Sequence, residues 1–368
     1  MRISKKRVMF FLPMLNGGGA ERVVLTLLEH IDKKHFEPIL VLLANKGHYA
    51  GMVSKGIKII DLQAPQARNA VFKIIKVIYS HKPDVVFTTL AYLNLIIAIL
   101  RPILPKNILF IARESNTVSI RNKREKYPRL FDWLYRHVYQ NFDLIVTQSE
   151  YMKNDLIINY NIAPEKMITI YNPVNTQTIK KQYNQTQPDL PKNHCNLLAV
   201  GKLSYQKGFD LLLETMRHLD KKYYLTILGE GNEYAALQEL IIKNNLQKQV
   251  HLAGFTQNPY SFMKNADLLV LSSRFEGLPN VVLEANSCGT PVVAFDAPGG
   301  TAEIIHNGKN GFLVPAFDTQ AFAQTIQKAC HYPFDYERIK KETEQNFGID
   351  KIIKLYENLF ISKTKTYQ

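Results

Sequence analysis

The sequence predicts an α/β protein with two Rossmann-like domains that face each other across a cleft. Short apolar runs alternate along the chain with segments of helical periodicity, which is typical of parallel sheets covered by helices. This alternation occurs twice, on either side of a polar stretch rich in Gln, Asn, Lys and Pro. The length of 368 residues also favours two domains over one compact core.

Six apolar runs in the first half are expected to be buried strands. The helical pattern after the first run follows three glycines, and Val23, Val24, Leu27 and Leu28 fall on one of its faces. A further helix is expected over 91–100. The six runs are 8–15, 38–44, 58–62, 84–90, 108–112 and 143–148.

Two apolar segments imitate membrane signals, and we interpret both as buried structure. The first 15 residues resemble a signal peptide, but their apolar run is short and contains Pro13, which favours a first strand. Residues 85–100 carry no charge, yet these 16 residues are fewer than a spanning helix requires, about 20. A strand followed by a helix is therefore expected there, with a spanning helix as the alternative.

The second half repeats the pattern with six more runs and with helices expected over 210–219 and 233–244. We divide the chain into a first domain at 1–175, a linker at 176–195 and a second domain at 196–348. A C-terminal helix within 349–368 is expected to cross back to the first domain. Ligands of such folds bind at the carboxyl ends of the strands. The six runs are 196–201, 223–229, 249–254, 266–272, 290–295 and 311–315.

The positive charge is concentrated in the first half. The net charge is +14, and residues 1–180 hold 26 basic against 13 acidic residues. This imbalance favours an anionic partner such as a lipid surface, nucleic acid or phosphates, and a merely solubilising surface is the alternative. The three cysteines, Cys195, Cys288 and Cys330, lack the spacing of a zinc site and are expected to be reduced thiols in a cytoplasmic protein.

The most specific chemistry lies in residues 271–285. A loop carrying Glu276 and Gly277 follows a buried strand, and Pro279 suits the first position of a helix that contains Glu284. Amides at that helix start favour phosphate, Gly277 lets the backbone approach closely, and carboxylates can accept hydrogen bonds from the diols of a nucleotide sugar.

These residues carry a family resemblance. Two glutamates separated by seven residues, within the text FEGLPNVVLEA and before GTPVVAF, resemble the signature of glycosyltransferase family 4, whose members are retaining enzymes of the GT-B fold. The resemblance extends over nearly the whole chain. It implies that Glu276 positions the donor sugar, that Glu284 holds ribose hydroxyls, and that Gly277 and Leu278 contact the donor.

Three further segments match that family in order. Lys202 and Lys207 stand in a segment similar to its Gly-Arg-Leu…Lys-Gly text, with Lys202 in place of Arg, and two cations there can offset the charge of a departing diphosphate. Gly229 and Gly231 resemble the turn beside the nucleotide base. Glu303 follows a Gly-rich loop that resembles a donor-contacting helix start. Solvated loop lysines, an ordinary turn and an ordinary loop-to-helix junction are the respective alternatives.

The first half adds acceptor-side and phosphate-side candidates. Gly17 and Gly18 can approach a donor phosphate or sugar, or they simply tighten a turn. Arg113, Glu114 and Asn116 are assigned to acceptor contacts. Relatives often have a His where this chain has Glu114, which leaves the identity of a general base open.

A basic and aromatic stretch at 119–140 is expected to be helical. Its cations can lie at a membrane interface or contact a lipid-linked pyrophosphate, and a solvated basic helix face is the alternative. The cations at its front are Arg121, Lys123, Arg124, Lys126 and Arg129.

The sequence thus predicts a metal-independent hexosyl- or N-acetylhexosaminyltransferase without a cofactor. We expect a nucleotide sugar, best a UDP-sugar, as donor and a lipid-linked or lipopolysaccharide-type glycan as acceptor, with the protein peripheral on the inner face of the cytoplasmic membrane. No Asp-x-Asp occurs, which argues against metal-clamped transfer. A sugar-nucleotide epimerase of the same fold and a basic nucleic-acid-binding protein are the alternatives, although no nucleic-acid reader motif is present.

Overall fold

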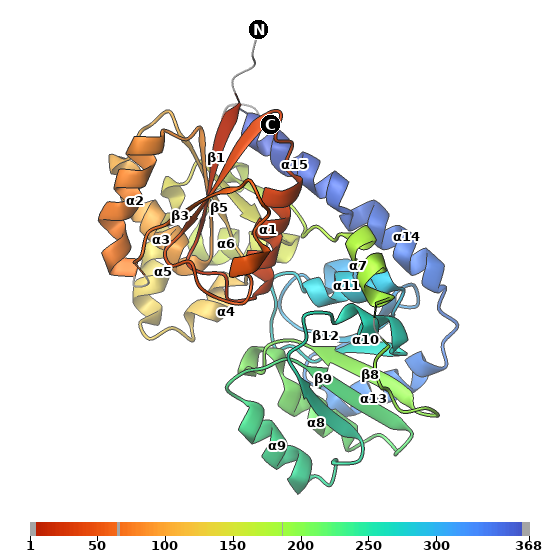
Figure 1. The fold of residues 1–368 in the computed structure, drawn as a ribbon. Helices are drawn as coiled ribbons and strands as arrows, with labels where there is room; N and C mark the ends of the chain where they lie inside the picture. Colours follow the sequence, from red (N-terminus) through yellow and green to blue (C-terminus); the bar gives the residue numbers. More distant parts are fainter. Residues whose placement is uncertain (1–4, 65–66, 186, 363–368) are drawn as a thin grey trace. The chain divides into compact units, whose positions relative to one another are not determined.

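The computed structural model describes residues 5–64, 67–185 and 187–362. The chain forms two compact units, of which one runs to Pro173 and resumes at Asp350 while the other spans Val174–Ile349 (Figure 1). Each unit is built on a single sheet with parallel strand pairs. The predicted α/β class with two Rossmann-like sheets is therefore confirmed.

The first sheet has the strand order β3-β2-β1-β4-β5-β6-β7. All six strands expected from the apolar runs are present. The seventh was missed, because three residues are too few to show a periodic pattern. The strands are β1 (Lys6–Leu12), β2 (Phe36–Leu42), β3 (Lys58–Asp61), β4 (Val85–Thr89), β5 (Leu109–Arg113), β6 (Leu144–Thr147) and β7 (Met167–Thr169).

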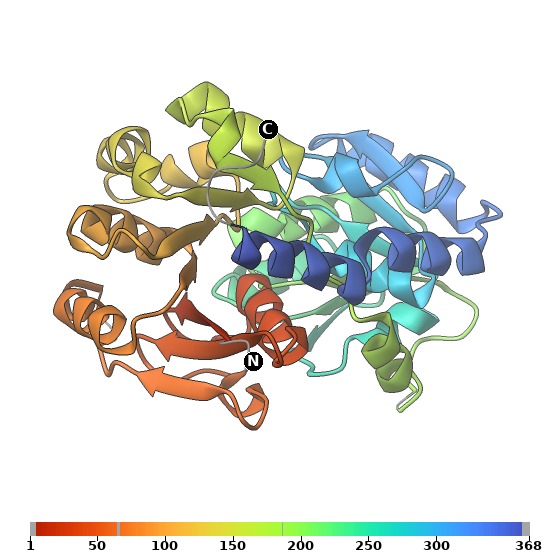
Figure 2. The ribbon, with the colours of Figure 1, turned by 90° about the horizontal axis from the view of Figure 1, so that it is seen from above.

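Helices cover both faces of this sheet (Figures 1 and 2). Met9 and Phe11 of β1 share a buried core with α2 and α3 on one face. On the other face the ring of Phe87 lies 5.9 Å from that of Phe360 on α15, between centroids. The helices are α1 (Gly19–His30), η1 (Ala50–Met52), α2 (Ala67–His81), α3 (Ala91–Leu100), η2 (Arg101–Ile103), α4 (Val118–Asn122), α5 (Pro128–His137), η3 (Tyr139–Asn141), α6 (Glu150–Tyr160), η4 (Pro164–Lys166) and α15 (Ile349–Ile361).

The basic stretch at 119–140 does not form one helix, which corrects the expectation from its spacing. It contains α4 and α5, separated by residues 123–127. The break lies directly before Pro128, whose ring disfavours helical geometry in the preceding residue and suits the first position of a new helix.

The second sheet has the strand order β10-β9-β8-β11-β12-β13 and contains the six strands expected in this half. The stretch expected to be a linker begins with α7, which packs against α10 and α11. The strands are β8 (Cys195–Val200), β9 (Tyr223–Leu228), β10 (Val250–Gly254), β11 (Leu268–Leu271), β12 (Val292–Asp296) and β13 (Gly311–Pro315). The helices are α7 (Thr176–Tyr183), η5 (Tyr205–Lys207), α8 (Phe209–Met216), α9 (Tyr234–Lys243), α10 (Tyr260–Asn265), α11 (Asn280–Cys288), α12 (Thr301–Ile304), α13 (Thr319–Cys330) and α14 (Tyr336–Phe347).

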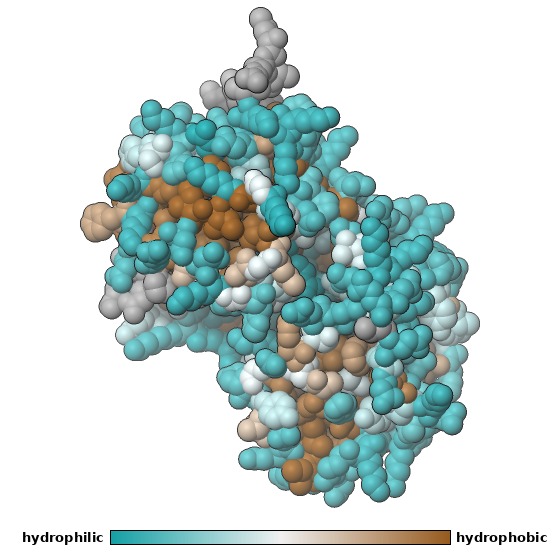
Figure 3. Space-filling view, viewed as in Figure 1, coloured by the Kyte–Doolittle hydropathy of each residue, from teal (hydrophilic) through white to brown (hydrophobic). Residues whose placement is uncertain are grey.

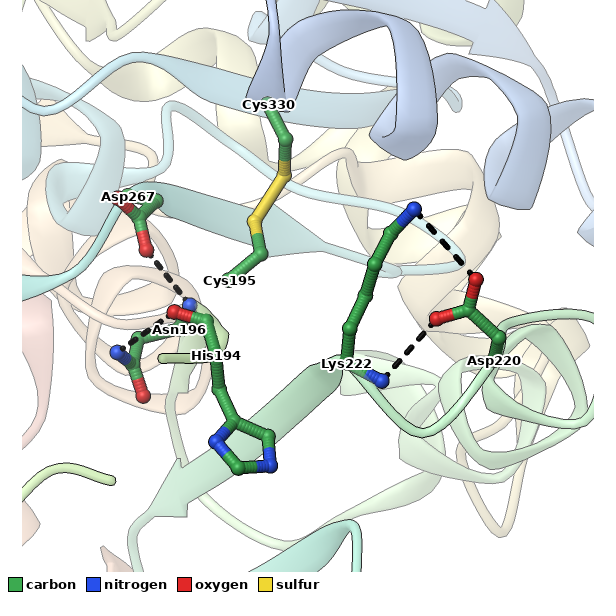
Figure 4. The surroundings of a disulfide bond; sticks show 7 residues. All are labelled: His194, Cys195, Asn196, Asp220, Lys222, Asp267 and Cys330. Atoms are coloured by element: carbon green, nitrogen blue, oxygen red, sulfur yellow. Dashed lines mark hydrogen bonds and ion pairs between the residues drawn. A yellow bond between two sulfur atoms is a disulfide. The ribbon is translucent and has the colours of Figure 1, made fainter. Parts of the chain in front are cut away.

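A disulfide joins Cys195 to Cys330, which corrects the expectation of three reduced thiols (Figure 4). Cys195 begins β8 and Cys330 ends α13, and their Cα atoms lie 6.8 Å apart. Residues 135 positions apart in sequence are brought together only by the fold, so spacing gave no sign of this pair. Cys288 is buried, and burial raises the pKa of its thiol to about 12.

The helices bear on the alternative of a membrane-spanning segment at 85–100. Among the described residues, none of the helices combines the length and the apolar character needed to cross a bilayer. Residues 85–100 form β4 and α3, as expected.

Candidate active site

The second unit brings four loops together at the carboxyl edge of its sheet, and we call them the carboxyl-edge loops. They follow β8 (201–208), β9 (229–233), β11 (272–279) and β12 (297–300). In a doubly wound sheet this edge is where ligands bind.

The loop after β8 supplies two ammonium groups. Lys202 is exposed on the loop, whereas Lys207 is partly buried and ends η5. Gly208 separates η5 from α8 and directs the chain into that helix. The structure thus places both predicted lysines at the carboxyl edge, at different depths.

Glu276 is the centre of the site. Its side chain is 7% exposed, and Oε1 accepts hydrogen bonds from Lys207 Nζ at 2.5 Å and from Ser273 Oγ at 2.7 Å. The amide of Gln206 lies 3.5 Å from Oε2. A carboxylate buried to this extent is stabilised by the ammonium group beside it, so the two charges of the pair offset each other among the carboxyl-edge loops.

Arg274 fastens the β11 loop to the β8 loop. Its guanidinium donates to both carboxylate oxygens of Asp210, at 2.8 and 2.6 Å, and to the carbonyl oxygen of Tyr205 at 2.9 Å. It also lies over the Tyr205 ring, 4.1 Å from the centroid. Burial alone would raise the pKa of Asp210, but the hydrogen bonds from Arg274 outweigh it and the pKa is lowered.

The loop after β12 closes on the backbone of the β11 loop. The amide of Glu276 donates to Pro298 O at 2.9 Å, and that of Gly300 donates to Gly277 O at 2.7 Å. Gly299 has a φ of +133°, and a Cβ there would overlap the carbonyl oxygen of Glu276. Only glycine fits both requirements, so this approach depends on the residue type.

The loop after β9 joins the same group. Leu203 N donates to Glu230 O at 2.9 Å, which ties the β9 loop to the β8 loop. A Cβ at Gly229, which has a φ of +145°, would overlap the carbonyl oxygen of Gly201. Gly231 packs equally closely on the backbone of Leu203. Both glycines of this turn therefore belong to the carboxyl-edge loops.

The remaining predicted donor residues surround this centre. Leu278 is buried, Pro279 stands immediately before the first residue of α11, and Glu284 is buried within that helix. Glu303 is half-buried in the first turn of α12, which follows Gly300. Helix α11 has nine residues, and its first amides begin at the β11 loop.

Gly17 and Gly18 belong to the other unit. They directly precede α1, where Gly18 is the N-cap residue. A Cβ at Gly17 would lie in ordinary contact with His48 and Tyr49, whereas one at Gly18 would press on the carboxylate of Glu21.

The three residues assigned to acceptor contacts occupy different environments. Arg113 and Glu114 are fully buried at the end of β5, while Asn116 is half-buried and accepts from the amide of Thr117 through its own side chain. Arg113 donates to Asn172 at 2.5 Å and to the hydroxyl of Tyr356 at 3.2 Å. These bonds connect β5 to the segment after β7 and to α15.

Glu114 anchors a second polar network inside the first unit. It accepts from the hydroxyls of Tyr135 (3.0 Å) and Tyr139, from Asn94 at 3.1 Å, and lies 3.6 Å from Arg121. Burial raises the pKa of both tyrosines, and the negative charge of Glu114 adds to the effect at each. Burial alone would lower the pKa of Arg121, but its neighbours Tyr135 and Glu114 raise it.

Arg121 is thereby set apart from the other predicted phosphate contacts. Its side chain is 17% exposed and points to Glu114, because a buried carboxylate requires a counter-charge. The other four cations are all exposed, between α4 and α5 or at the start of α5. They are Lys123, Arg124, Lys126 and Arg129.

Sequence patterns missed the polar side chains that hold the site together. Ser273 and Gln206 contact Glu276, and Asp210 pairs with Arg274. Their common signal was position, since each lies within a few residues of a predicted lysine or glutamate. Among the described residues, no three His, Cys, Asp or Glu side chains are grouped so that they could hold a metal ion.

Comparisons with known proteins assign the family. Residues 17–178 match the family described as "Glycosyltransferase Family 4", and residues 180–346 match "Glycosyl transferases group 1". A Campylobacter jejuni protein named N-acetylgalactosamine-N,N'-diacetylbacillosaminyl-diphospho-undecaprenol 4-alpha-N-acetylgalactosaminyltransferase is 30% identical over 328 residues, 86% of this chain and 88% of the relative. The chain is a family 4 glycosyltransferase.

Other matches agree with this assignment. The amylovoran biosynthesis glycosyltransferase AmsD of Erwinia amylovora is 23% identical to this glycosyltransferase over 85% of the chain and 86% of the relative. Among solved structures, Anabaena Alr3699/HepE in complex with UDP aligns with a TM-score of 0.79 at 19% identity, over 96% of this chain and 99% of the other. The GT-B fold expected from the sequence is thus confirmed.

Proposed function

We propose that this glycosyltransferase moves a hexosyl or N-acetylhexosaminyl group from a UDP-sugar to a growing glycan on a lipid diphosphate or lipopolysaccharide-type carrier, with retention of configuration and without a metal. The observation that carries the proposal is the buried Lys207–Glu276 pair among the carboxyl-edge loops. An ammonium group and a carboxylate there can serve the two ends of a nucleotide sugar, its diphosphate and its hydroxyls.

Each predicted residue has a role in this proposal. Lys207 and the exposed Lys202 offset the charge that develops on the departing diphosphate. Glu276 accepts hydrogen bonds from donor-sugar hydroxyls, and Glu284 accepts them from the ribose. The remaining donor contacts are backbone and side-chain groups of the second unit: Gly277, Leu278, Gly229, Gly231 and Glu303.

The proposed step exchanges one bond to the sugar for another. The bond between the anomeric carbon and the diphosphate oxygen breaks, and UDP leaves with the electron pair. The acceptor hydroxyl forms its new bond from the same face, and its proton passes to the leaving phosphate. No protein nucleophile takes part, so Glu276 positions the donor without forming a covalent intermediate.

The printed names of relatives support the donor and the acceptor class. The Campylobacter relative is named for an α-linked N-acetylgalactosaminyl transfer on a diphospho-undecaprenol carrier. Structural neighbours are described in complex with UDP, with UDP and glucose, and with UDP-glucose. A lipid carrier also requires the protein to work at a membrane surface, and we propose the cytoplasmic face.

A transfer assay with paired lysine variants tests the site. Purified protein receives UDP-GalNAc, UDP-GlcNAc or UDP-glucose with a short-chain prenyl-diphosphate glycan, and mass spectrometry and NMR measure product and anomeric configuration. We expect Lys207→Ala to lower kcat by about a hundredfold or more, because one electrostatic contact to a transition state contributes on that scale. Lys222→Ala is the matched control, since Lys222 pairs with Asp220 next to the opposite end of β9 (Figure 4).

Two results would overturn the proposal. Near-normal turnover by a folded Lys207→Ala or Glu276→Gln protein would show that the substituted residue does not take part in transfer. Formation of an epimer of the donor in a reaction without acceptor would show that the protein catalyses isomerisation instead of transfer. Salt-sensitive binding to random duplex DNA is the separate test of the basic first half as a nucleic-acid surface.

A further inference from the structure

The outer helices of the first unit carry several large apolar side chains that are exposed to solvent. On α2, residues 72 and 79 are seven positions apart, and on α5, residues 130 and 133 are three positions apart, so each pair lies on one face of its helix. We call this surface the outer helical face. It contains Phe72 and Tyr79 on α2, Ile99 on α3, Ile103 on η2, and Leu130 and Trp133 on α5, with exposed fractions from 49% to 84%.

Direct contacts join these helices into one surface. The hydroxyl of Tyr79 donates to the carbonyl oxygen of Ile103 at 2.8 Å, which connects α2 to η2. The ring of Tyr92 packs edge-on against Phe131 at 5.3 Å between centroids, which connects α3 to α5. Figure 3 shows a separate hydrophobic area, in brown, mainly over the part of this unit where β3 lies in Figure 1, with its edge beside α2.

Cations predominate on this face. Helices α2, α3 and η2 contain no Asp or Glu, and Lys76 on α2 is exposed. The cations at 123–129 continue this charge at the edge of α5. Two acids lie near these cations: Glu125 accepts from the hydroxyl of Tyr92, and Asp132 accepts from that of Tyr160.

We infer that the outer helical face is the surface through which the protein lies on an anionic lipid bilayer. Its aromatic and aliphatic side chains enter the boundary between headgroups and acyl chains, and the 123–129 cations contact lipid phosphates. Exposed apolar groups next to Lys and Arg fit both layers of such an interface. A second copy fits less well, because a two-fold contact would bring two equally basic faces together.

This inference gives residues to the membrane contact of the proposed function, and it rests on the lipid-borne acceptor proposed there. It extends well beyond the basic stretch expected from the sequence, because the deepest contacts are assigned to α2, α3 and η2. Vesicle binding without any sugar substrate is therefore the readout, so that its failure is separate from a failure of transfer.

Trp133 makes the test direct, because it is the only tryptophan in the chain and is 53% exposed. Vesicles of phosphatidylcholine with phosphatidylglycerol are titrated into the whole protein while emission is recorded. We expect a blue shift and quenching by lipids brominated near the headgroup end of the acyl chain. Vesicles of phosphatidylcholine alone are expected to bind more weakly.

Paired variants separate the apolar from the electrostatic part. Ile99→Ser with Ile103→Ser is expected to weaken partitioning by about tenfold at every salt concentration, since two half-exposed side chains lose their lipid contact. Lys123→Glu with Lys126→Glu is expected to weaken it only at low salt. Ile242→Ser is the matched control, because Ile242 is 62% exposed on α9 of the other unit.

Three outcomes overturn the inference. If the emission of Trp133 does not change when anionic vesicles are added, the outer helical face does not contact the membrane. If the Ile99/Ile103 variant and the wild type bind anionic vesicles equally well, the membrane contact lies on another surface. A dimer in light scattering without lipid, abolished by the same two substitutions, assigns the face to a second copy. Transfer to a short-chain soluble acceptor is measured in parallel, and its persistence in any of these cases keeps the proposed function intact.

Discussion

Breaking the Cys195–Cys330 bond should lower the stability of the second unit by a large and calculable amount. The bond closes a loop over a sequence separation of 135 residues, which restricts the unfolded chain and leaves the folded one unchanged. The loop-entropy relation gives about 5 kcal/mol at 25 °C for a loop of this length. For a domain the size of Val174–Ile349, that corresponds to a fall in Tm of about 10–20 °C.

Calorimetry with and without reductant measures this effect. Wild-type protein and Cys288→Ser are expected to lose the same number of degrees on reduction, because Cys288 is buried and outside the bond. Cys195→Ser is expected to melt at the reduced temperature under both conditions. Thiol titration of the unfolded, unreduced chain should find one thiol instead of the three in the sequence.

The position of the bond predicts that transfer is unaffected. Cys195 begins β8, and Figure 4 shows it near Lys222 and Asp267, which directly precede β9 and β11. This is the amino edge of the sheet, whereas the carboxyl-edge loops lie at the other end of the same strands. If reductant leaves the Tm unchanged although titration finds one thiol, the entropy argument is refuted. If titration finds three thiols, the disulfide does not form.

Three other predictions concern backbone and charge. Gly299→Ala should destabilise the second unit by about 2 kcal/mol or more, because its φ of +133° and a neighbouring carbonyl oxygen exclude a Cβ; an unchanged Tm would contradict this. Since Arg274 lowers the pKa of Asp210, the stability from this pair is complete above about pH 4 and lost as the pH falls further. Asp210→Asn should therefore flatten the acid limb of a Tm-against-pH plot, and an unaltered limb would count against the pair. Glu114→Gln should lower the free energy of unfolding in urea by about 3 kcal/mol, because it leaves the largely buried Arg121 without a counter-charge. Adding Arg121→Met should recover most of this loss if the reasoning is correct.

The sequence predicted most of the second unit because its information is local. A strand, a glycine or proline and a helix start follow one another within about ten residues, so Glu276 and Lys207 could be placed at loop ends from their neighbours alone. Their distance of 2.5 Å could not be predicted, since it depends on two loops 69 positions apart. The same limitation hid Asp210 and the disulfide.

The first unit shows the opposite case, in which residue type misleads without tertiary partners. Arg113 and Glu114 were assigned to acceptor contacts because they follow a strand at a place where relatives often have a functional His. Arg121 was assigned to phosphate because it stands in a basic and aromatic stretch. Their partners come from other segments of the chain, namely Asn172, Tyr356, Tyr135 and Tyr139. No periodic pattern in the sequence predicts these contacts. Polar networks of this kind become visible only once the fold brings the segments together.

The ion pair at the carboxyl edge gives the proposed donor a specific way to enter the site. Before a donor arrives, the charges of Lys207 and Glu276 offset each other in a largely buried position. A diphosphate brings stronger negative charge and competes for the ammonium group. The carboxylate, still held by Ser273 at 2.7 Å, then accepts from a sugar hydroxyl in place of the ammonium group. One exchange of partners would thus prepare both groups at once, which gives a transferase a reason to keep such a pair.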